Sequence, residues 1–439
     1  MTGSIKSAAR KRVGTVLGKM RTRPAYARLF LIEDTILRWG AALLRNDLHD
    51  PSFSSGDSQL VVIATAGSGN IGDHAMLATV LQKAECRTTV ICNSAAAFSQ
   101  SLESTPQVTW IELPGLLDRG LLTRIPDAWK FHRIARRASQ IGVIGADVMD
   151  GRYFPTSSIA RCSILAASQR AGQTTAVFGF SWSAEPVTSA VTAMRYLGKS
   201  QSTLYVRDPI SRDRLVSLGV ENTVGVADLV FSLQSAKHSD EEQGSTVVVN
   251  VSGLVSGAGV EATVYVKLVD ELVERGYTVL VLPHVIRPGD SDLDAQAALR
   301  SLRPPNASVD YIDRLLDPLD VKAIVRKCRF VVTGRMHLGI LSLSEGVPAA
   351  IINTNGKAEG LYSLFELPNL SIELDELHDS SRLVSVVSQI ENYGLDSLVE
   401  TIKSNLPKVT SLSAQNFTWM EYDSGDKIAR TDRGVQCPR

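Results

Sequence analysis

The side chains best suited to chemistry are concentrated between Val331 and Lys357. An apolar run ends at Gly334, and Arg335 and His337 then open a predicted helix. Lys357 follows the next apolar run. Strand–helix–strand units place such residues at the carboxyl edge of a parallel sheet, where α/β proteins bind ligands. Two cations and one titratable imidazole at that edge suit a small, highly charged anion that also needs a proton.

A second candidate site begins with the G-x-G-x-x-G pattern of residues 67–72, which follows an apolar run and opens a predicted helix. A lone match is weak evidence for dinucleotide binding, and the acidic residue that would hold a ribose is missing after the next strand. What remains is a backbone that approaches a ligand closely, with Asn70, Asp73 and His74 at the helix start. Asp73 is interpreted either as a functional carboxylate or as the N-cap of this helix.

Other predicted strands also end in polar side chains. Asp147 and Asp150 follow one strand and would either bind sugar hydroxyls or cap the next turn. Arg207 ends another strand, where it either points toward a cleft or pairs with its neighbour Asp208. His284 ends a third strand. All of these positions meet at one sheet edge if the strands are parallel.

Metal-dependent chemistry is not indicated by the sequence. Asp290-Ser291-Asp292 matches the D-x-D pattern that holds a divalent cation in some glycosyltransferases, but it leads straight into a predicted helix. Capping of that helix is therefore the preferred interpretation. The chain has no H-E-x-x-H pattern, no paired C-x-x-C, no P-loop lysine and no G-x-S-x-G elbow. We expect neither a bound metal nor a cofactor.

Apolar strands and helices alternate along residues 59–236 and again along residues 244–406. Such alternation is typical of parallel α/β units. A polar, charged connection at residues 234–244 separates the two series. We therefore expect an α/β fold of two Rossmann-like domains that face a cleft, as in GT-B enzymes, with an acceptor-side first domain. A basic extension and linker, residues 1–58, would precede them, and a polar tail, residues 407–439, would follow.

The N-terminal extension carries a charge that the whole chain does not. The 439 residues have a net charge of zero, yet residues 1–45 hold ten Lys and Arg against two acidic residues. Apolar side chains recur there at helical spacing: Leu29, Ile32, Ile36 and Leu37. The pattern fits either a basic amphipathic helix lying on an anionic membrane or an extension packed on the body of the protein. The basic stretch 129–137 would add to membrane contact or form an ordinary surface helix.

The remaining features bear on location and partners. The five cysteines are scattered, without zinc spacing or a disulfide framework, as is typical of reduced thiols. No apolar run approaches the roughly 18 residues needed to span a bilayer. We expect a cytoplasmic protein, held at the inner face of the plasma membrane where the extension binds lipid. Nucleic acid is not an expected partner, because the basic residues are not interleaved with aromatic side chains across one face.

Five motifs together resemble the polysaccharide pyruvyl transferase family, and they occur in that family's order. They are N-I-G-D at 70–73, V-R-D-x-x-S at 206–211, A-D at 227–228, L-P-H at 282–284 and G-R-M-H…G-V-P…K at 334–357. The resemblance covers residues 60–370. One departure is at 145–147, Gly-Ala-Asp, where the family usually has a glycine-rich stretch.

The resemblance implies transfer of the pyruvate moiety of phosphoenolpyruvate (PEP) to two hydroxyls of a saccharide, forming a cyclic ketal and releasing phosphate. Arg207, Arg335 and Lys357 would bind PEP. His337 would protonate the PEP methylene as a general acid, and Asp73 would act on the acceptor hydroxyl as a base or orienting carboxylate. The acceptor-binding residues would be Asn70, His74, Asp150 and His284. A lipid-linked saccharide is an acceptor that membrane contact would suit.

Two other functions stay open at the level of sequence. The first is a GT-B-like glycosyltransferase that uses a nucleotide sugar. The second is a non-catalytic binding protein that keeps the fold. Retention of the cations together with His337 argues against the second, because a degenerate site should have lost some of them. The sequence identifies neither the acceptor sugar nor the hydroxyls that react.

Overall fold

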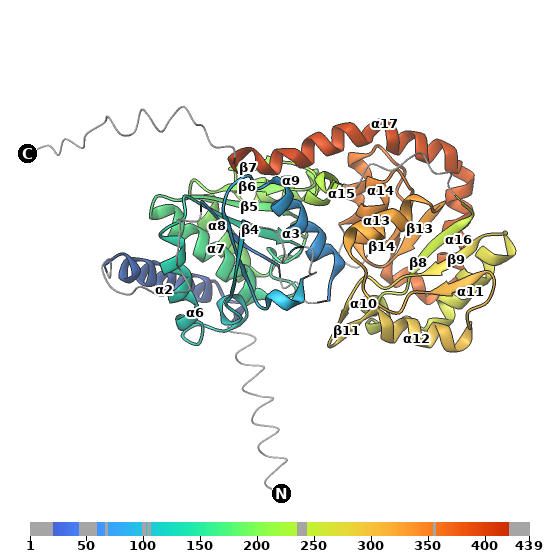
Figure 1. Ribbon diagram of the computed structural model, residues 1–439, viewed down its shortest axis with the longest axis horizontal. Coiled ribbons are helices and arrows are strands. Elements are labelled where there is room, and N and C mark those ends of the chain that lie inside the picture. The colour runs from blue at the N-terminus through green and yellow to red at the C-terminus, as the bar shows by residue number, and fades with distance from the viewer. Residues whose placement is uncertain are drawn as a thin grey trace, which may run out of the picture.

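The computed structural model describes residues 21–43, 59–65, 69–98, 102, 107–234, 244–353 and 357–420. It contains two α/β domains that lie side by side, with the first and last described helices on the outside (Figure 1). Each domain is built on a parallel sheet, one of seven strands and one of six. The expected α/β fold with two Rossmann-like domains is confirmed.

The first sheet has the strand order β3-β2-β1-β4-β5-β6-β7. Its strands are β1 (Leu60–Ile63), β2 (Thr88–Cys92), β3 (Val108–Glu112), β4 (Gln140–Ala146), β5 (Thr174–Phe180), β6 (Thr203–Val206) and β7 (Thr223–Gly225). The helices of this domain are α2 (Pro24–Leu43), α3 (Ile71–Lys83), η2 (Ala95–Ala97), α5 (Gly115–Asp118), α6 (Ile125–Ala135), α7 (Pro155–Arg170), α8 (Thr188–Gly198), α9 (Pro209–Ser217) and η3 (Leu229–Ser232).

Both faces of this sheet are covered, which explains why its strands are continuous apolar runs. Val61 and Ile63 enter a core shared with α6, α7 and α8. Leu60 and Val62 point to the opposite face, into a core that includes α3 and continues into the second domain. Because side chains alternate along a strand, four consecutive apolar residues fill two cores.

The second sheet has the order β12-β9-β8-β13-β14-β15. Its strands are β8 (Thr246–Asn250), β9 (Thr278–Val281), β12 (Val309–Tyr311), β13 (Phe330–Thr333), β14 (Ala349–Asn353) and β15 (Ser371–Glu373), with a separate hairpin of β10 (Ile286–Arg287) and β11 (Asp290–Ser291). The helices are α10 (Gly253–Gly257), α11 (Ala262–Glu274), α12 (Asp292–Leu302), α13 (Pro318–Arg326), α14 (Met336–Ser344), α15 (Ala358–Leu364), η4 (Leu374–His378), α16 (Ser380–Tyr393), α17 (Leu395–Ala414) and η5 (Gln415–Met420).

The C-terminal helix extends further than the sequence indicates. A polar tail is expected from residue 407, but α17 continues past Pro407 and crosses from the second domain to the first (Figure 1). There η5 packs on β5: the ring centroids of Phe417 and Trp419 lie 6.1 Å and 5.3 Å from that of Phe178. Burial of these aromatic side chains fixes the segment. The rest of the expected tail, residues 421–439, lies outside the described residues.

Helix α2 packs on α6, α7 and α8 of the first domain, so the extension is attached to the body. The attachment is ionic at its centre. The two carboxylate oxygens of Asp34 each accept a hydrogen bond of 3.1 Å from Arg124, and one lies 3.0 Å from Nε2 of His132. Leu37 packs against the core, whereas other apolar side chains of α2 point outward. Residues 1–20 and 44–58 of the expected extension and linker lie outside the described part of the chain.

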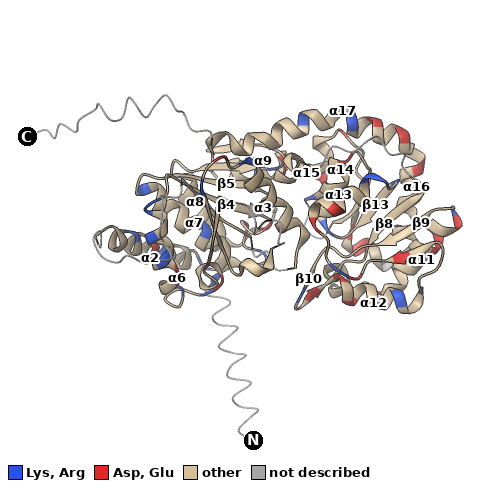
Figure 2. Ribbon diagram, viewed as in Figure 1, with Lys and Arg blue, Asp and Glu red and all other residues tan. Residues whose placement is uncertain are grey.

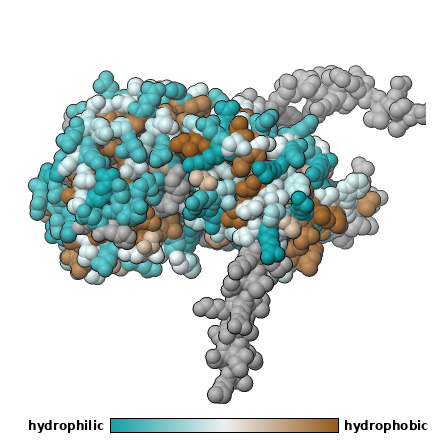
Figure 3. Space-filling view, turned by 180° about the vertical axis from the view of Figure 1, so that it is seen from behind, coloured by the Kyte–Doolittle hydropathy of each residue, from teal (hydrophilic) through white to brown (hydrophobic). Residues whose placement is uncertain are grey.

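The outward face of α2 is apolar. Its exposed side chains follow a spacing of three and four residues: Leu29, Ile32, Ile36, Trp39 and Leu43. Figure 3 shows brown, hydrophobic side chains gathered at the end of the molecule that α2 covers. This helix therefore buries charges and exposes a hydrophobic stripe, the reverse of an ordinary surface helix. No described helix is long and apolar enough to cross a membrane.

Candidate functional site

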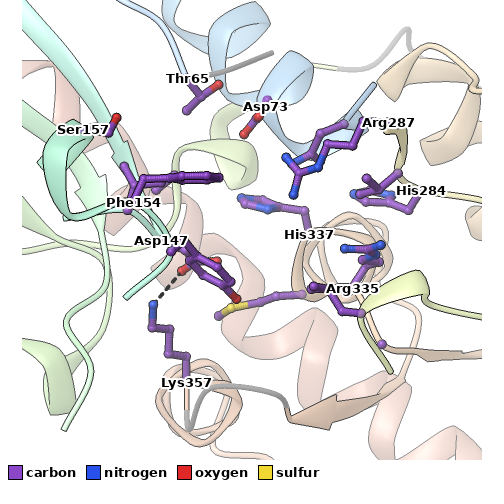
Figure 4. Close-up of a pocket in the computed structure, with 18 of the residues that line it drawn as sticks. Thr65, Asp73, Asp147, Phe154, Ser157, His284, Arg287, Arg335, His337 and Lys357 are labelled. Atoms are coloured by element: carbon purple, nitrogen blue, oxygen red, sulfur yellow. Dashed lines mark hydrogen bonds and ion pairs between the residues drawn. The ribbon is translucent and has the colours of Figure 1, made fainter. Parts of the chain in front are cut away.

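A cavity of about 540 Å³ lies where the two domains meet. Strand ends and loops of the first domain form one side, and the β10–β11 hairpin with the N-termini of α14 and α15 forms the other (Figure 4). Seven of the residues singled out from sequence line it: Asn70, Asp73, Asp147, His284, Arg335, His337 and Lys357. Among the described residues that line the cavity, Arg207, His74 and Asp150 do not appear.

His337 is placed by the turn between β13 and α14. Gly334 must be small at this turn, because a Cβ there would lie 2.5 Å from the Cβ of Ser252. His337 is 8% exposed, and its ring projects into the cavity (Figure 4). Its Nε2 lies 3.7 Å from Asp228 and has no hydrogen-bond partner within the described structure. A buried imidazole with an unsatisfied nitrogen is suited to exchanging a proton with a ligand.

The N-terminus of α3 faces His337 from the first domain. Asn70 is its N-cap, accepting a 2.9 Å hydrogen bond from the Gly72 amide. Asp73 is therefore not the cap, and its buried carboxylate lines the cavity. His74 lies one residue further on, where its Nε2 is 2.6 Å from the carbonyl of Ala97 and its ring packs on Phe98. The acceptor contact expected of His74 would require that ring to leave this position.

The two domains touch at the cavity through their backbones. The Ile286 amide donates to the Gly69 carbonyl at 2.7 Å, and the Ile71 amide donates to the His284 carbonyl at 3.1 Å. Gly69 adopts a φ of +66°, and a Cβ there would lie 1.8 Å from the Ile286 oxygen. Within the glycine pattern, Gly69 thus serves a close approach between backbones and is required for it.

Arg335 lines the cavity with its charge already compensated. Its guanidinium donates to Asp292 at 2.6 Å and 3.0 Å, and to Asp290 at 3.2 Å. These are the two acids of the D-x-D pattern, whose middle residue, Ser291, caps α12. The pKa of Arg335 is raised: burial opposes its charge, but the two carboxylates outweigh burial. No group of three or more His, Cys, Asp or Glu among the described residues is arranged to hold a metal ion.

Arg207 is buried behind the cavity instead of lining it. It donates to Asp228 at 2.7 Å, to the Ser181 hydroxyl at 2.6 Å, and to Asp147. The alternative ion pair between Arg207 and Asp208 is not formed within the described structure: Asp208 instead caps α9, where it accepts a 2.7 Å hydrogen bond from the Ser211 amide. Arg207 therefore positions two carboxylates, one of which reaches the cavity.

Lys357 connects the two domains. Its Nζ lies 3.3 Å from Asp147 of the first domain (Figure 4) and 3.4 Å from Asp150 of the same domain. Burial alone would raise the pKa of Asp147, but the charges of Arg207 and Lys357 hold it well below its usual range. Asp147 is thus an anion at neutral pH. Asp150 is fully buried, and its other oxygen accepts from the Arg152 amide at 3.1 Å.

His284 is a neutral imidazole at the wall of the cavity. Burial, together with the neighbouring charges of His337 and Arg335, moves its pKa well below the usual 6.5. Neither ring nitrogen has a hydrogen-bond partner among the residues described. Such a ring can accept or donate one hydrogen bond to a ligand hydroxyl.

The cavity also contains residues that the sequence argument missed. They come from the first domain, near the start of α7: Thr65, Phe154, Thr156, Ser157 and Arg161. Of these residues, Arg161 could have been noticed in the sequence, because it is an arginine within a helix of small and apolar residues. Burial lowers the pKa of Arg161 to about 10, so it remains charged at neutral pH.

The lining of the cavity is positively charged overall. It includes five cationic side chains and three carboxylates: Arg21, Arg161, Arg287, Arg335 and Lys357 against Asp73, Asp118 and Asp147. The lining alone therefore carries two more positive than negative charges, although Asp290, Asp292 and Asp150 behind it pair with Arg287, Arg335 and Lys357. An anionic ligand would replace some of these carboxylate contacts in a partly buried site, where solvent screening is weak.

Comparison with known proteins identifies the family and the fold. The family model described as polysaccharide pyruvyl transferase matches residues 70–356. The amylovoran biosynthesis protein AmsJ of Erwinia amylovora is 25% identical over 130 residues, which are 29% of this chain and 31% of that protein. The match thus spans about a third of the length of this relative.

Solved structures share the architecture at low sequence identity. UDP-GlcNAc 2-epimerase from Methanocaldococcus jannaschii has a TM-score of 0.51 at 11% identity, covering 75% of this chain and 91% of that one. HepE of Anabaena, solved with UDP and glucose, has 0.52 at 14%, covering 86% and 100%. A UDP-glucosyltransferase from Polygonum tinctorium has 0.52 at 12%, covering 84% and 100%. These likenesses show a GT-B-like fold.

Proposed function

Because this chain belongs to the polysaccharide pyruvyl transferase family, we propose that it transfers the pyruvate moiety of PEP to two hydroxyls of one sugar. The C2 carbon of PEP forms two C–O bonds to the sugar and loses its bond to the phosphate oxygen. Of the two hydroxyl protons released, one ends on the former methylene, which becomes a methyl group, and the other on phosphate. The balance needs no oxidant and no cofactor.

The observation that supports this chemistry best is His337, whose Nε2 is unsatisfied among the described residues inside a cavity lined by five cationic side chains. Protonation of the PEP methylene creates positive character at C2, which a hydroxyl then attacks. His337 is the general acid for that proton. Asp73, on the opposite domain, is the carboxylate that orients the hydroxyl or accepts its proton.

PEP carries a carboxylate and a phosphate, and both need cations. Arg335 and Lys357 line the cavity from the second domain and bind these groups directly. Arg207 supports them from behind, because it holds Asp147, the acid that also pairs with Lys357. Binding of an anion at Lys357 replaces the contact with Asp147. Asn70 of the first domain and His284 of the second domain line the cavity and contact the acceptor, whereas His74 and Asp150 support the site from outside the lining.

The decisive measurement is calorimetric binding of PEP beside UDP, GDP and inorganic phosphate. PEP should bind, and Arg335→Met should weaken it about tenfold or more, since a charged hydrogen-bonding partner is lost. Arg314→Met, on an exposed side chain of the same domain, is the matched control. His337→Ala should bind PEP yet fail to release phosphate in the presence of acceptor. Binding of UDP or GDP without PEP would support the nucleotide-sugar glycosyltransferase instead, and no binding of any ligand would also reject the proposal.

We propose in addition that the protein is cytoplasmic and that α2 lies on an anionic membrane surface, the inner face of the plasma membrane. Its apolar stripe is exposed, with Trp39 at 70% and Leu43 at 79%. Lys and Arg occur on both α2 and α6 (Figure 2), and of these Arg28 and Lys130 are exposed whereas Arg38 is buried. An apolar face beside cations is what binds anionic lipid, and it would bring a lipid-linked acceptor to the enzyme.

Membrane contact is tested by co-sedimentation with vesicles. Phosphatidylglycerol vesicles should retain the protein, phosphatidylcholine vesicles should retain less, and the pair Ile36→Ser with Trp39→Ser should abolish retention. Val216→Ser, on an exposed apolar side chain of α9, is the matched control. Retention of the double variant equal to wild type would reject the assignment to α2.

A further inference from the structure

The start of α7 forms a second charged subsite, on the first-domain side of the cavity. Arg161 lies two turns into this helix, and its guanidinium bends back to the first turn, where Nη1 contacts the hydroxyl and the carbonyl of Ser157. Arg161 is only 2% exposed, yet it lines the cavity. No described carboxylate forms an ion pair with it, and its Nε has no hydrogen-bond partner there. Burying a cation without a paired anion costs free energy, so this position favours an anionic ligand.

Other polar groups around Arg161 are also unsatisfied. Thr156, in the first turn of α7, and Thr65, at the end of β1, are both nearly buried and line the cavity. Neither side-chain hydroxyl has a hydrogen-bond partner among the described residues. Helix α7 also starts without a side-chain cap, and because its first residue, Pro155, has no N–H, the first amides that could contact a ligand are those of Thr156 and Ser157. Amides at a helix N-terminus, hydroxyls and a guanidinium together are the groups that bind phosphate.

This subsite differs from the donor side in its charge balance. Arg335 is compensated by Asp290 and Asp292, and Lys357 by Asp147. Asp73 and Asp118 act on Arg161 only through longer-range electrostatics. In Figure 4, Ser157 and Thr65 lie at the opposite side of the view from Arg335. The cavity therefore presents cations from both domains, Arg161 from the first and Arg335 with Lys357 from the second.

An aromatic side chain stands beside the subsite. Phe154 immediately precedes α7 and is 52% exposed, and its ring extends into the cavity (Figure 4). Exposed aromatic rings next to polar groups pack against the apolar face of a sugar ring. A sugar on Phe154 with its phosphate at the start of α7 would satisfy both features.

We propose that the first-domain half of the cavity binds the acceptor as a glycosyl phosphate, with phosphoryl oxygens at the N-terminus of α7, Thr156 and Arg161. The inference deepens the proposed function and rests on it in treating this ligand as the acceptor. The shared chemistry is a sugar joined to phosphate or diphosphate. Either a lipid or a nucleoside can carry that group.

The test is calorimetric binding of glucose 1-phosphate and of uncharged methyl α-glucoside, each with and without saturating PEP. Wild type should bind glucose 1-phosphate about tenfold tighter or more, since a charged hydrogen bond is gained, and PEP should not displace it. Arg161→Met should remove this preference while leaving PEP affinity within about twofold, because it touches no donor contact. Thr156→Val is a milder variant that keeps the size of the side chain. It should weaken the binding of glucose 1-phosphate and leave the binding of PEP and methyl α-glucoside unchanged.

Arg170→Met is the control, because Arg170 is an exposed arginine at the far end of the same helix. It should change nothing. Equal binding of glucose 1-phosphate and methyl glucoside by wild type would overturn the subsite. Loss of PEP binding in Arg161→Met, with glucose 1-phosphate unaffected, would assign the cation to the donor. If wild type does not bind PEP but binds glucose 1-phosphate in a way that depends on Arg161, the donor proposal would be rejected and the subsite would be kept.

Competition distinguishes the two carriers of the phosphate. Farnesyl diphosphate should displace glucose 1-phosphate if the acceptor is lipid-linked, and UDP should displace it if the acceptor is nucleotide-linked. Displacement by neither would overturn the assignment to an acceptor diphosphate and leave a monophosphate subsite.

Discussion

The ring of His337 lies directly against the backbone of Gly72, across the boundary between the two domains. A Cβ added at Gly72 would come within 2.5 Å of both Cγ and Nδ1 of that ring. The first turn of α3 therefore sets the position of the imidazole, although His337 belongs to α14. Asp73, the next residue of α3, is carried on the same turn. One short segment of the first domain thus places both groups proposed for proton transfer.

Gly72→Ala should displace the His337 ring and lower pyruvyl transfer about 100-fold, because misplacement of a reacting group by about 1 Å has this effect. The cations that bind PEP are untouched, so its affinity should stay close to wild type. Phosphate release and calorimetry measure the two quantities. Gly257→Ala is the control, since nothing lies within 4 Å of its Cβ position. Unchanged turnover in Gly72→Ala would show that the position of the His337 ring is unimportant.

Asp292→Asn should destabilise the second domain strongly. Asp292 is fully buried and accepts hydrogen bonds from the amides of Gly253, His284 and Val285, as well as from Arg335. An amide nitrogen in place of one oxygen would face these donors and leave Arg335 undercompensated. The free energy of unfolding, measured with urea, should fall by about 3–5 kcal/mol. Asp294→Asn, on the exposed side of the same helix turn, should lose less than about 0.5 kcal/mol. Similar losses in the two variants would contradict this role.

Stability should fall as the solution is acidified, because of the network under α2. Burial alone would raise the pKa of Asp34, but Arg124 and His132 bring it down to about 2. The ionised carboxylate therefore stabilises the fold by about 2 kcal/mol above pH 3.8, and this is lost as pH falls toward 2. Burial also lowers the pKa of His132 below 6.5, so a further loss begins just below pH 6.5.

Urea unfolding between pH 2.5 and 7 measures this profile. Asp34→Asn should be less stable at pH 7 and should change less than wild type between pH 4 and pH 2.5. Glu185→Gln, which alters an exposed carboxylate, should follow wild type. Parallel profiles for Asp34→Asn and wild type would show that another acid is responsible.

Ala146→Gly should stabilise the protein. Ala146 ends β4 with a φ of +45°, a conformation that costs a residue with a Cβ about 1–2 kcal/mol. Glycine removes that strain, but it also makes the unfolded chain more flexible, which offsets part of the effect. The free energy of unfolding in urea should therefore rise by up to about 1 kcal/mol. Ala176→Gly, in the middle of the neighbouring strand β5, should instead lose about 1 kcal/mol. Equal losses at the two alanines would mean that the backbone at Ala146 is unstrained.

The left-handed backbone at Ala146 falls within residues 145–147, where the sequence departs from the glycine-rich stretch expected from the family resemblance. Such a backbone suits glycine, and here a residue with a Cβ adopts it. The motif locates the position, and the dihedral angle gives a physical reason for glycine there.

Residues at the ends of buried strands were the most predictable. Arg335, His337 and Lys357 follow apolar runs, and a parallel sheet brings such ends to one edge. Arg207 has the same kind of position, but Asp147 and Asp228 bind its guanidinium, and they lie 60 and 21 residues away in the chain. No local pattern shows which carboxylate will reach a given arginine. The contact between Gly72 and His337 is hidden for the same reason.

The ends of the fold were less predictable because local signals oppose the tertiary contacts. Pro407 and the polar residues around it indicate the end of a helix, yet α17 continues to Ala414. Burial of Phe417 on β5 outweighs the backbone hydrogen bond that proline removes. In α2, Asp34 lies on the buried face, whereas a hydrophobic pattern would place a charged residue on the outside.

The chain passes between the domains twice, first between Gln234 and Gly244 and again along α17. The two domains are therefore joined covalently in two places as well as by contacts at the cavity. Those contacts include the hydrogen bonds of Ile71 and Ile286 and the ion pairs of Lys357 with Asp147 and Asp150. Any separation of the domains would break these contacts, and their return would bring Gly72 back against the ring of His337.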